Sequence, residues 1–250
     1  MNAKSHSHSH ATAGGRPDFP LIDYHVHLGP DLSLEQAVKL SEQKKVKFGI
    51  VENVGPQSLV KNDEELLKYI NRLRQYPVYV GLQPTVLNWS QHYSKEVLDQ
   101  LDYVLMDADT VPLPDGSYLR IWQNDLFIDD MDEFMEIYMH HITQILAHEP
   151  IDIFGRPTYL PINFAREYDR LWTNERLSVI IDLARERHIA LEIQENVRIP
   201  SDRFIAMAKK AGVKFTFGTN ARNHNAGHFH YCLEMAAKHG LTRDDMFIID

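Results

Sequence analysis

The chain has 250 residues, of which 44% are hydrophobic, and a formal net charge of −9. This charge argues against a nucleic-acid groove or an anionic membrane surface as the partner, and no segment approaches the roughly 20 uncharged apolar residues that a membrane-spanning helix needs. Cys232 is the only cysteine, so an internal disulfide is excluded and a reducing, cytoplasmic compartment is expected.

The N-terminal segment, residues 1–17, contains alternating serine and histidine from Ser5 to His10, followed by small residues. It has no apolar period and lacks the apolar core of a secretory signal. We expect a disordered native tail or an affinity tag, and we assign its histidines no catalytic role. Residues 18–250 are expected to form a single domain.

Short β-rich runs alternate with amphipathic helical patterns from Pro20 onward. The predicted strands are 21–27, 47–52, 78–83, 103–106, 151–154, 189–193 and 213–217. The predicted helices are 33–43, 63–75, 94–100, 131–147, 174–187, 201–211 and about 227–239. Because parallel neighbours need a crossover helix, this alternation predicts a parallel sheet.

Seven strands suit either a barrel or an open doubly wound sheet. No glycine-rich phosphate loop follows the first predicted strand, which weakens the nucleotide-binding version of the open sheet. We therefore predict an α/β fold of the barrel type, a distorted TIM-like (β/α)7 barrel.

The segment from Asp107 to Asp130 interrupts this rhythm. Residues 111–119 within it predict a hairpin that turns at Asp115 and Gly116. A loop of this length in a compact domain is usually a lid or a binding element, although a surface excursion without a role is an equal alternative.

The first predicted strand ends in Tyr24-His25-Val26-His27 and stops at Gly29-Pro30. Side chains alternate along a strand, so His25 and His27 point the same way. Two imidazoles at the carboxyl end of a barrel strand can share one divalent cation, at the end where barrel enzymes carry their chemistry.

The other predicted strands also end in polar or charged residues. Read as one set at the mouth of a barrel, these positions are Glu52, Asn53, Gln83, Asp107, Asp109, Arg156, Glu192, Asn220 and Arg222. Surface loops are polar too, so the aggregate is more informative than any single position. Trp89, Tyr118 and Trp122 could wall a pocket or form a subunit contact in a homo-oligomer.

These motifs resemble, in order, those of the PHP (polymerase and histidinol phosphatase) superfamily. The opening Asp-Tyr-His-Val-His is similar to the signature of that family, and the similarity continues through residues 49–53, 102–107, 151–157, 191–193 and 217–222. The resemblance implies a distorted barrel of seven β/α units that binds up to three metal ions and hydrolyses phosphate esters.

The chain departs from that pattern at most metal positions. His25 and His27 remain, but Glu52-Asn53 and Gln83 stand where the family has ligands, and Asp109, Arg156, Asn220 and Arg222 replace further ones. Arginine stays protonated and cannot donate a lone pair to a metal. We therefore expect at most one ion, Zn or Mn, on His25 and His27, with Arg156 and Arg222 occupying two vacated cation positions.

The first functional hypothesis is a metal-dependent hydrolase of a small anionic substrate, with Asp107 or Glu192 as the catalytic base. The polar set Glu52, Asn53, Gln83, Asp109, Arg156, Asn220 and Arg222 would then bind the substrate. The second is an inactive PHP-like barrel that binds an anionic ligand. The third is an amidohydrolase-type barrel, which also opens with His-x-His.

Overall fold

Seven parallel strands close into a barrel in the order β1-β2-β3-β4-β7-β8-β9, which confirms the predicted fold class. The computed structural model describes residues 17–55, 58 and 60–249. The predicted tail therefore lies outside the described residues, apart from Pro17. The strands are β1 (Ile22–Val26), β2 (Lys47–Val54), β3 (Tyr79–Pro84), β4 (Tyr103–Met106), β7 (Ile153–Phe154), β8 (Ala190–Gln194) and β9 (Phe215–Gly218).

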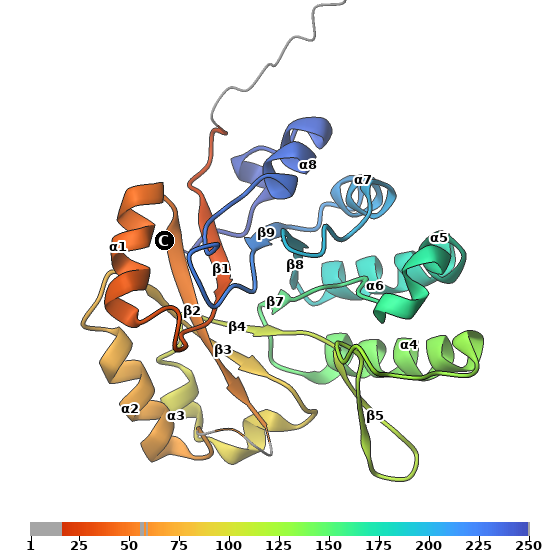
Figure 1. Ribbon diagram of the computed structural model, residues 1–250, viewed down its shortest axis with the longest axis horizontal. Helices are drawn as coiled ribbons and strands as arrows, with labels where there is room; N and C mark the ends of the chain where they lie inside the picture. Colours follow the sequence, from red (N-terminus) through yellow and green to blue (C-terminus); the bar gives the residue numbers. More distant parts are fainter. Residues whose placement is uncertain (1–16, 56–57, 59, 250) are drawn as a thin grey trace, which may run out of the picture.

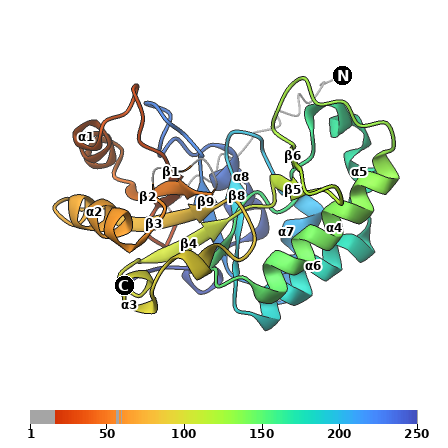
Figure 2. The same ribbon diagram turned by 90° about the horizontal axis from the view of Figure 1, so that it is seen from below.

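Helices surround the barrel on its outer side (Figures 1 and 2). They are α1 (Leu34–Lys44), α2 (Asp63–Leu73), α3 (Lys95–Leu98), α4 (Met131–His148), α5 (Tyr168–Leu171), α6 (Asn174–Glu186), α7 (Asp202–Lys210) and α8 (Tyr231–His239), with 3₁₀ turns at Trp89–His92, Ile162–Glu167 and Arg243–Asp245. In the described part of the chain, no helix combines the length and apolarity that crossing a bilayer requires.

Local sequence signals explain where the long helices begin. The hydroxyl of Ser33 accepts a hydrogen bond from the backbone N–H of Gln36, and the side-chain oxygen of Gln36 accepts one from the backbone N–H of Ser33, so α1 starts with a capping box. Asn62 caps α2 in a similar way, as Ser201 caps α7. These are the positions at which the helical periodicity also begins, so sequence and structure agree here to within a residue or two.

Three predicted elements needed correction. The strand expected at 151–154 is shorter, Ile153–Phe154, and the helix expected at 94–100 is limited to Lys95–Leu98. The last helix starts at Tyr231 rather than near residue 227. Gly227 has a φ of 70° and donates its N–H to Asp23, so the chain is still turning there. The short helical segments between 162 and 171 have no periodicity long enough to detect.

The predicted hairpin is confirmed. Strands β5 (Thr110–Pro112) and β6 (Tyr118–Arg120) pair antiparallel around the turn at Asp115 and Gly116, and the hairpin lies beside α4 (Figure 2). Its base is buried through Val111 and Ile121, which are both inaccessible to solvent. The hairpin is therefore anchored in the core while its tip is exposed.

The lower half of the barrel interior is apolar and aromatic. Tyr24, Tyr103 and neighbouring side chains from six strands form one cluster that the C-terminal residues Phe247–Ile249 cover. Tyr103 donates a hydrogen bond to the backbone oxygen of Tyr24 at 2.6 Å, and Tyr24 donates to that of Phe247. This end of the barrel is closed, which leaves the carboxyl ends of the strands as the open end.

Candidate active site at the barrel mouth

The open end contains a cavity of about 390 Å³, here called the mouth cavity. It is lined by Asn53, Gln83, Thr85, Asp107, Asp109, Thr110, Trp122, Arg156, Asn220 and Arg222. Most of the residues that the sequence analysis placed at strand ends thus lie around one space. Glu52 lines the adjoining cavity, whereas the buried residues His25, His27 and Glu192 line neither cavity.

A shift in strand register explains how β1 delivers its histidines. The pairing of β1 with β2 shifts between Asp23 and Val26, so simple alternation fails there. Tyr24 packs in the inner cluster, and the rings of His25 and His27 lie 5.4 Å apart. The expected pairing of the two imidazoles is therefore present in the structure.

Asp23 does not join them. Its carboxylate accepts hydrogen bonds from the backbone N–H groups of Thr219 and Gly227, at 3.0 and 2.7 Å, and from the hydroxyl of Thr219. It thereby connects β1 to the chain that follows β9. We interpret Asp23 as a buried brace for the mouth.

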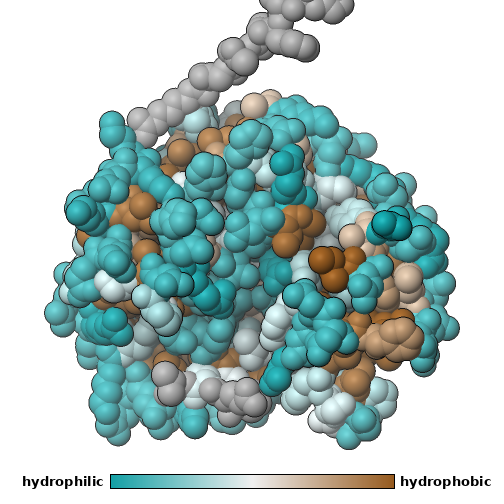
Figure 3. Space-filling view, viewed as in Figure 1, coloured by the Kyte–Doolittle hydropathy of each residue, from teal (hydrophilic) through white to brown (hydrophobic). Residues whose placement is uncertain are grey.

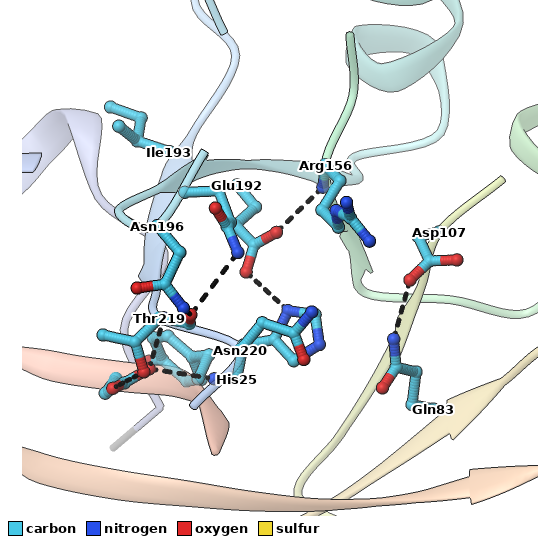
Figure 4. A network of polar contacts seen from close by, with 12 residues as sticks. His25, Gln83, Asp107, Arg156, Glu192, Ile193, Asn196, Thr219 and Asn220 are labelled. Atoms are coloured by element: carbon cyan, nitrogen blue, oxygen red, sulfur yellow. Dashed lines mark hydrogen bonds and ion pairs between the residues drawn. The ribbon is translucent and has the colours of Figure 1, made fainter. Parts of the chain in front are cut away.

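His25 is held by a carboxylate from β8, which is separated from β1 in the barrel only by β9. Its Nδ1 lies 2.7 Å from Oε1 of Glu192, and both side chains are fully buried (Figure 4). Burial is the largest single influence and lowers the pKa of His25, but the charge and the hydrogen bond of Glu192, together with the charge of Asp107, raise it by more, so the net pKa is raised. The other oxygen of Glu192 accepts the backbone N–H of Arg156 at 2.8 Å. Glu192 thus orients two site residues.

His27 has the opposite electrostatic setting. Burial, the nearby His25 and the guanidinium of Arg222 all lower its pKa well below the usual value for histidine. The two imidazoles therefore differ: the pKa of His25 is raised, whereas that of His27 is lowered.

Arg156 is the central cation of the mouth. Its guanidinium forms an ion pair with Asp109, and both side chains are buried. It also stacks on the ring of Tyr159, with Cζ 3.6 Å from the ring centroid. Its backbone φ is 49°, a left-handed conformation that costs a non-glycine residue about 1 kcal/mol or more. The bonds to Glu192 and Asp109 hold it there.

Asp107 faces the cavity beside this pair. It accepts a hydrogen bond from Nε2 of Gln83 at 2.7 Å and another from the backbone of Asp109 at 3.1 Å (Figure 4). Burial raises the pKa of Asp109, while the adjacent guanidinium acts in the opposite direction. The network keeps two carboxylates close together because an arginine lies next to one of them.

Arg222 is the more accessible cation. It lies exposed on the rim, where it donates to the side chain of Asn220 at 3.2 Å. Among the described residues it forms no ion pair within 4 Å, although Glu52 is close enough to influence its pKa. Arg222 can therefore turn its charge toward an incoming anion.

Several buried polar atoms at this end of the barrel have no hydrogen-bond partner. Within the described part of the chain they are Nε2 of His25, Nε2 of His27, Oε1 of Gln83, Oδ1 of Asp109 and Nε of Arg156. Buried polar atoms are nearly always satisfied in folded proteins. Their concentration at one place indicates a ligand or ordered solvent.

The residues do not fit a two- or three-metal centre. Among the residues that the structure describes, no group of three or more His, Cys, Asp or Glu side chains could hold a metal ion. The guanidinium of Arg156 also lies close enough to His25 to affect its pKa. The unpartnered Nε2 atoms of His25 and His27 are two nitrogen donors, fewer than the three protein ligands that catalytic zinc usually has.

The sequence analysis missed Tyr159 and the bracing role of Asp23. Tyr159 follows Arg156 by three residues in a turn, where its backbone N–H bonds to the Arg156 oxygen. Nothing in the sequence marks that turn as part of the site. The histidines after β9, at 224, 228 and 230, are exposed.

Comparison with known proteins adds no family. No family model and no curated protein matches this chain. Solved structures that align with it include a chain of archaeal ribonuclease P with mature tRNA, 15% identical with a TM-score of 0.41 over 92% of this chain and 98% of that one. The HpcH/HpaI aldolase from Desulfitobacterium hafniense DCB-2 is 11% identical, with a TM-score of 0.41 over 80% and 86%. A D-hydantoinase from Bacillus sp. AR9 is 13% identical, with a TM-score of 0.37 over 80% and 46%. At these values none of them informs the activity of this chain.

Proposed function

We propose that this protein is a hydrolase that acts on a small phosphate ester bound in the mouth cavity. The observation that carries the proposal is the His25–Glu192 pair. Nε2 of His25 is buried without a partner, and the charges of Asp107 and Arg156, which line the mouth cavity, lie close enough to affect the pKa of His25. The motif order that resembles PHP phosphoesterases supports the same reaction class.

Arg222 and Arg156 bind the phosphate in this proposal. Guanidinium groups bind phosphate through paired, charge-assisted hydrogen bonds. Arg222 has no ion pair among the described residues, and Nε of Arg156 has no partner. Gln83, Asn53 and Asn220 add neutral polar groups around the same space.

The acid–base roles follow from the positions and charges of Asp107 and His25. Asp107, the carboxylate in the cavity wall, takes a proton from the attacking water as the new P–O bond forms. His25, whose pKa is raised, gives its proton to the leaving alcohol oxygen as the ester P–O bond breaks. Glu192, expected from the sequence as a possible base, is proposed as the residue that positions His25.

In the metal-dependent version of this proposal, His25 and His27 hold one divalent ion, Zn or Mn. A bound ion would polarise a phosphate oxygen or activate water. Glu192 would then act as the carboxylate that orients a histidine ligand.

An inactive barrel that binds an anion is the second candidate. One specific observation favours it: each buried carboxylate of the mouth already accepts hydrogen bonds, from Gln83, Arg156 or His25. Such a site can bind phosphate without turning it over.

Turnover of p-nitrophenyl phosphate decides between the two. The assay uses protein with His6, His8 and His10 replaced, in EDTA and then with added Mn²⁺ or Zn²⁺. We expect turnover that falls at least ~100-fold in His25→Gln and a KM raised ~10-fold in Arg222→Gln. Arg185→Gln, on the exposed side of α6, is the matched control and should be unchanged.

Inorganic phosphate binding without turnover under any metal condition would instead establish the binding protein. Turnover that requires added metal, and a metal content near one per chain that disappears in His27→Gln, would place the ion on the histidine pair. Two or three tightly held ions per chain would contradict the proposed arginine-based site.

A further inference from the structure

A second cavity adjoins the mouth cavity under the β5–β6 hairpin. This hairpin cavity has a volume of about 460 Å³, and its lining includes Glu52, Asn53, Thr85, Thr110, Tyr118, Arg120, Trp122 and Gln123. Four residues, Asn53, Thr85, Thr110 and Trp122, line both cavities. The two spaces therefore adjoin along a shared wall, and both volumes fall in the range of about 300–1,000 Å³ typical of ligand sites.

The hairpin connects the two cavities in the chain as well. Asp109, in the mouth, directly precedes β5, and its backbone oxygen accepts the N–H of Ile121 at 3.0 Å. Trp122 follows at once. Any ligand that spans both cavities would therefore contact a segment whose base is fixed to the site and buried in the core.

The wall of the hairpin cavity mixes hydrogen-bond donors and acceptors. Arg120 only donates, and ionised Glu52 only accepts. Amide groups from Asn53 and Gln123 and the hydroxyls of Thr85 and Thr110 can do both. A hydroxyl group is also both donor and acceptor. A ligand with several hydroxyls can therefore form hydrogen bonds with these side chains, whereas a hydrocarbon cannot.

Two aromatic side chains complete the wall. Trp122 is 43% exposed and Tyr118 is 48% exposed, although each is a large apolar group. The face of the protein in Figure 3 is mostly hydrophilic, with apolar residues in small patches. Aromatic rings that remain exposed beside a polar cavity offer a flat apolar surface with a polar edge. A ring that carries hydroxyls at its rim fits such a surface.

We propose that the substrate is a phosphorylated sugar, with its phosphate in the mouth cavity and its ring in the hairpin cavity between Glu52, Arg120 and Trp122. This inference rests on the proposed phosphate site and adds the identity of the group attached to the phosphate. The hairpin residues are then specificity residues, and the strand-end residues recognise the phosphate.

The test measures equilibrium binding of three phosphonates that cannot be hydrolysed: methylphosphonate, benzylphosphonate and the phosphonate analogue of glucose 6-phosphate. Calorimetry should show that the sugar phosphonate binds at least ~10-fold more tightly than the other two. In the double variant Tyr118→Ala/Arg120→Ala, this advantage should disappear while methylphosphonate affinity is unchanged. Arg222→Gln should weaken all three.

Equal affinity for the sugar and methyl compounds would overturn the proposal, as would an advantage that survives in the double variant. If benzylphosphonate bound as tightly as the sugar phosphonate, the hairpin cavity would favour an aromatic group rather than a sugar, and the proposal would also be overturned. In each of these outcomes the phosphate site still stands. Absence of binding by all three would overturn both this inference and the proposed function.

Discussion

At the end of the barrel covered by Phe247–Ile249, the interior is filled by aromatic and aliphatic side chains whose polar atoms are bonded to backbone oxygens. At the other end, the same strands carry buried imidazoles, carboxylates and a guanidinium, several of which have unpartnered atoms. The boundary falls within single strands: Tyr103 and Leu105 belong to the closed end, and Asp107 belongs to the mouth.

The difference separates stability from function along each strand. Buried apolar surface at the closed end stabilises the fold, whereas each unsatisfied polar atom at the mouth costs free energy unless a ligand binds. In parallel barrels the carboxyl ends of the strands are the functional end. Substitutions at the two ends should accordingly change different measurements.

The largest effect on stability is expected from Tyr103→Ala at the closed end. The ring of Tyr103 packs directly against Gly81, where an added Cβ would lie only 2.7 Å from Cε1 of the ring. Because glycine has no side chain, Gly81 cannot fill the space that truncation of Tyr103 leaves. We expect a loss of about 3–5 kcal/mol in the free energy of unfolding, measured with urea. Tyr103→Phe, which removes only the bond to the Tyr24 oxygen, should lose about 1 kcal/mol. A loss below about 1 kcal/mol for the alanine variant would mean that the interior can collapse around the gap.

The sequence predicts the closed end well because packing leaves a periodic signal. Alternation along the strands and the 3.6-residue period of the helices are both visible, and they place the seven strands and most helices within a few residues. The convergence of the strand-end residues also follows from topology alone, since parallel strands bring their carboxyl ends to one edge.

The connections inside the mouth are not predictable in this way. The register shift in β1, which separates Asp23 from His25, leaves no mark in the sequence pattern. The bond between His25 and Glu192 joins residues that are 167 positions apart, and it depends on barrel closure. The left-handed backbone of Arg156 is likewise a consequence of tertiary contacts, because arginine has no preference for it.

A smaller loss of stability with a larger loss of function is expected from Gly218→Ala at the mouth. An added Cβ would overlap Oε1 of Glu192 and lie 2.8 Å from Cβ of His25. Displacing them should cost about 1–3 kcal/mol of stability and reduce phosphate-ester turnover ~100-fold, since the acid–base pair is separated. Urea unfolding and steady-state kinetics measure the two quantities.

Gly29→Ala is the matched control for this substitution, because a Cβ there meets nothing within 4 Å. It should change stability by no more than about 0.5 kcal/mol, as expected for a surface substitution away from any special feature. Full turnover in Gly218→Ala would mean that the reaction does not need the His25–Glu192 contact.

The smallest effect concerns pH and the core behind the hairpin. His141 in α4 is buried with neither ring nitrogen bonded, and burial lowers its pKa to about 4. A lowered pKa means that the unfolded chain binds the proton more tightly, so stability is lost as pH falls below about 6.5 toward 4. The buried tyrosines of the closed end have pKa values raised above 10 and do not titrate in this range.

His141→Leu should therefore remove up to about 1.4 kcal/mol of destabilisation per pH unit between pH 6.5 and 5, measured by urea unfolding at each pH. The exposed His228, which lies between β9 and α8 in the chain, provides the control, because His228→Gln should leave the slope unchanged. An unaltered slope in His141→Leu would assign the acid sensitivity to the carboxylates of the mouth instead.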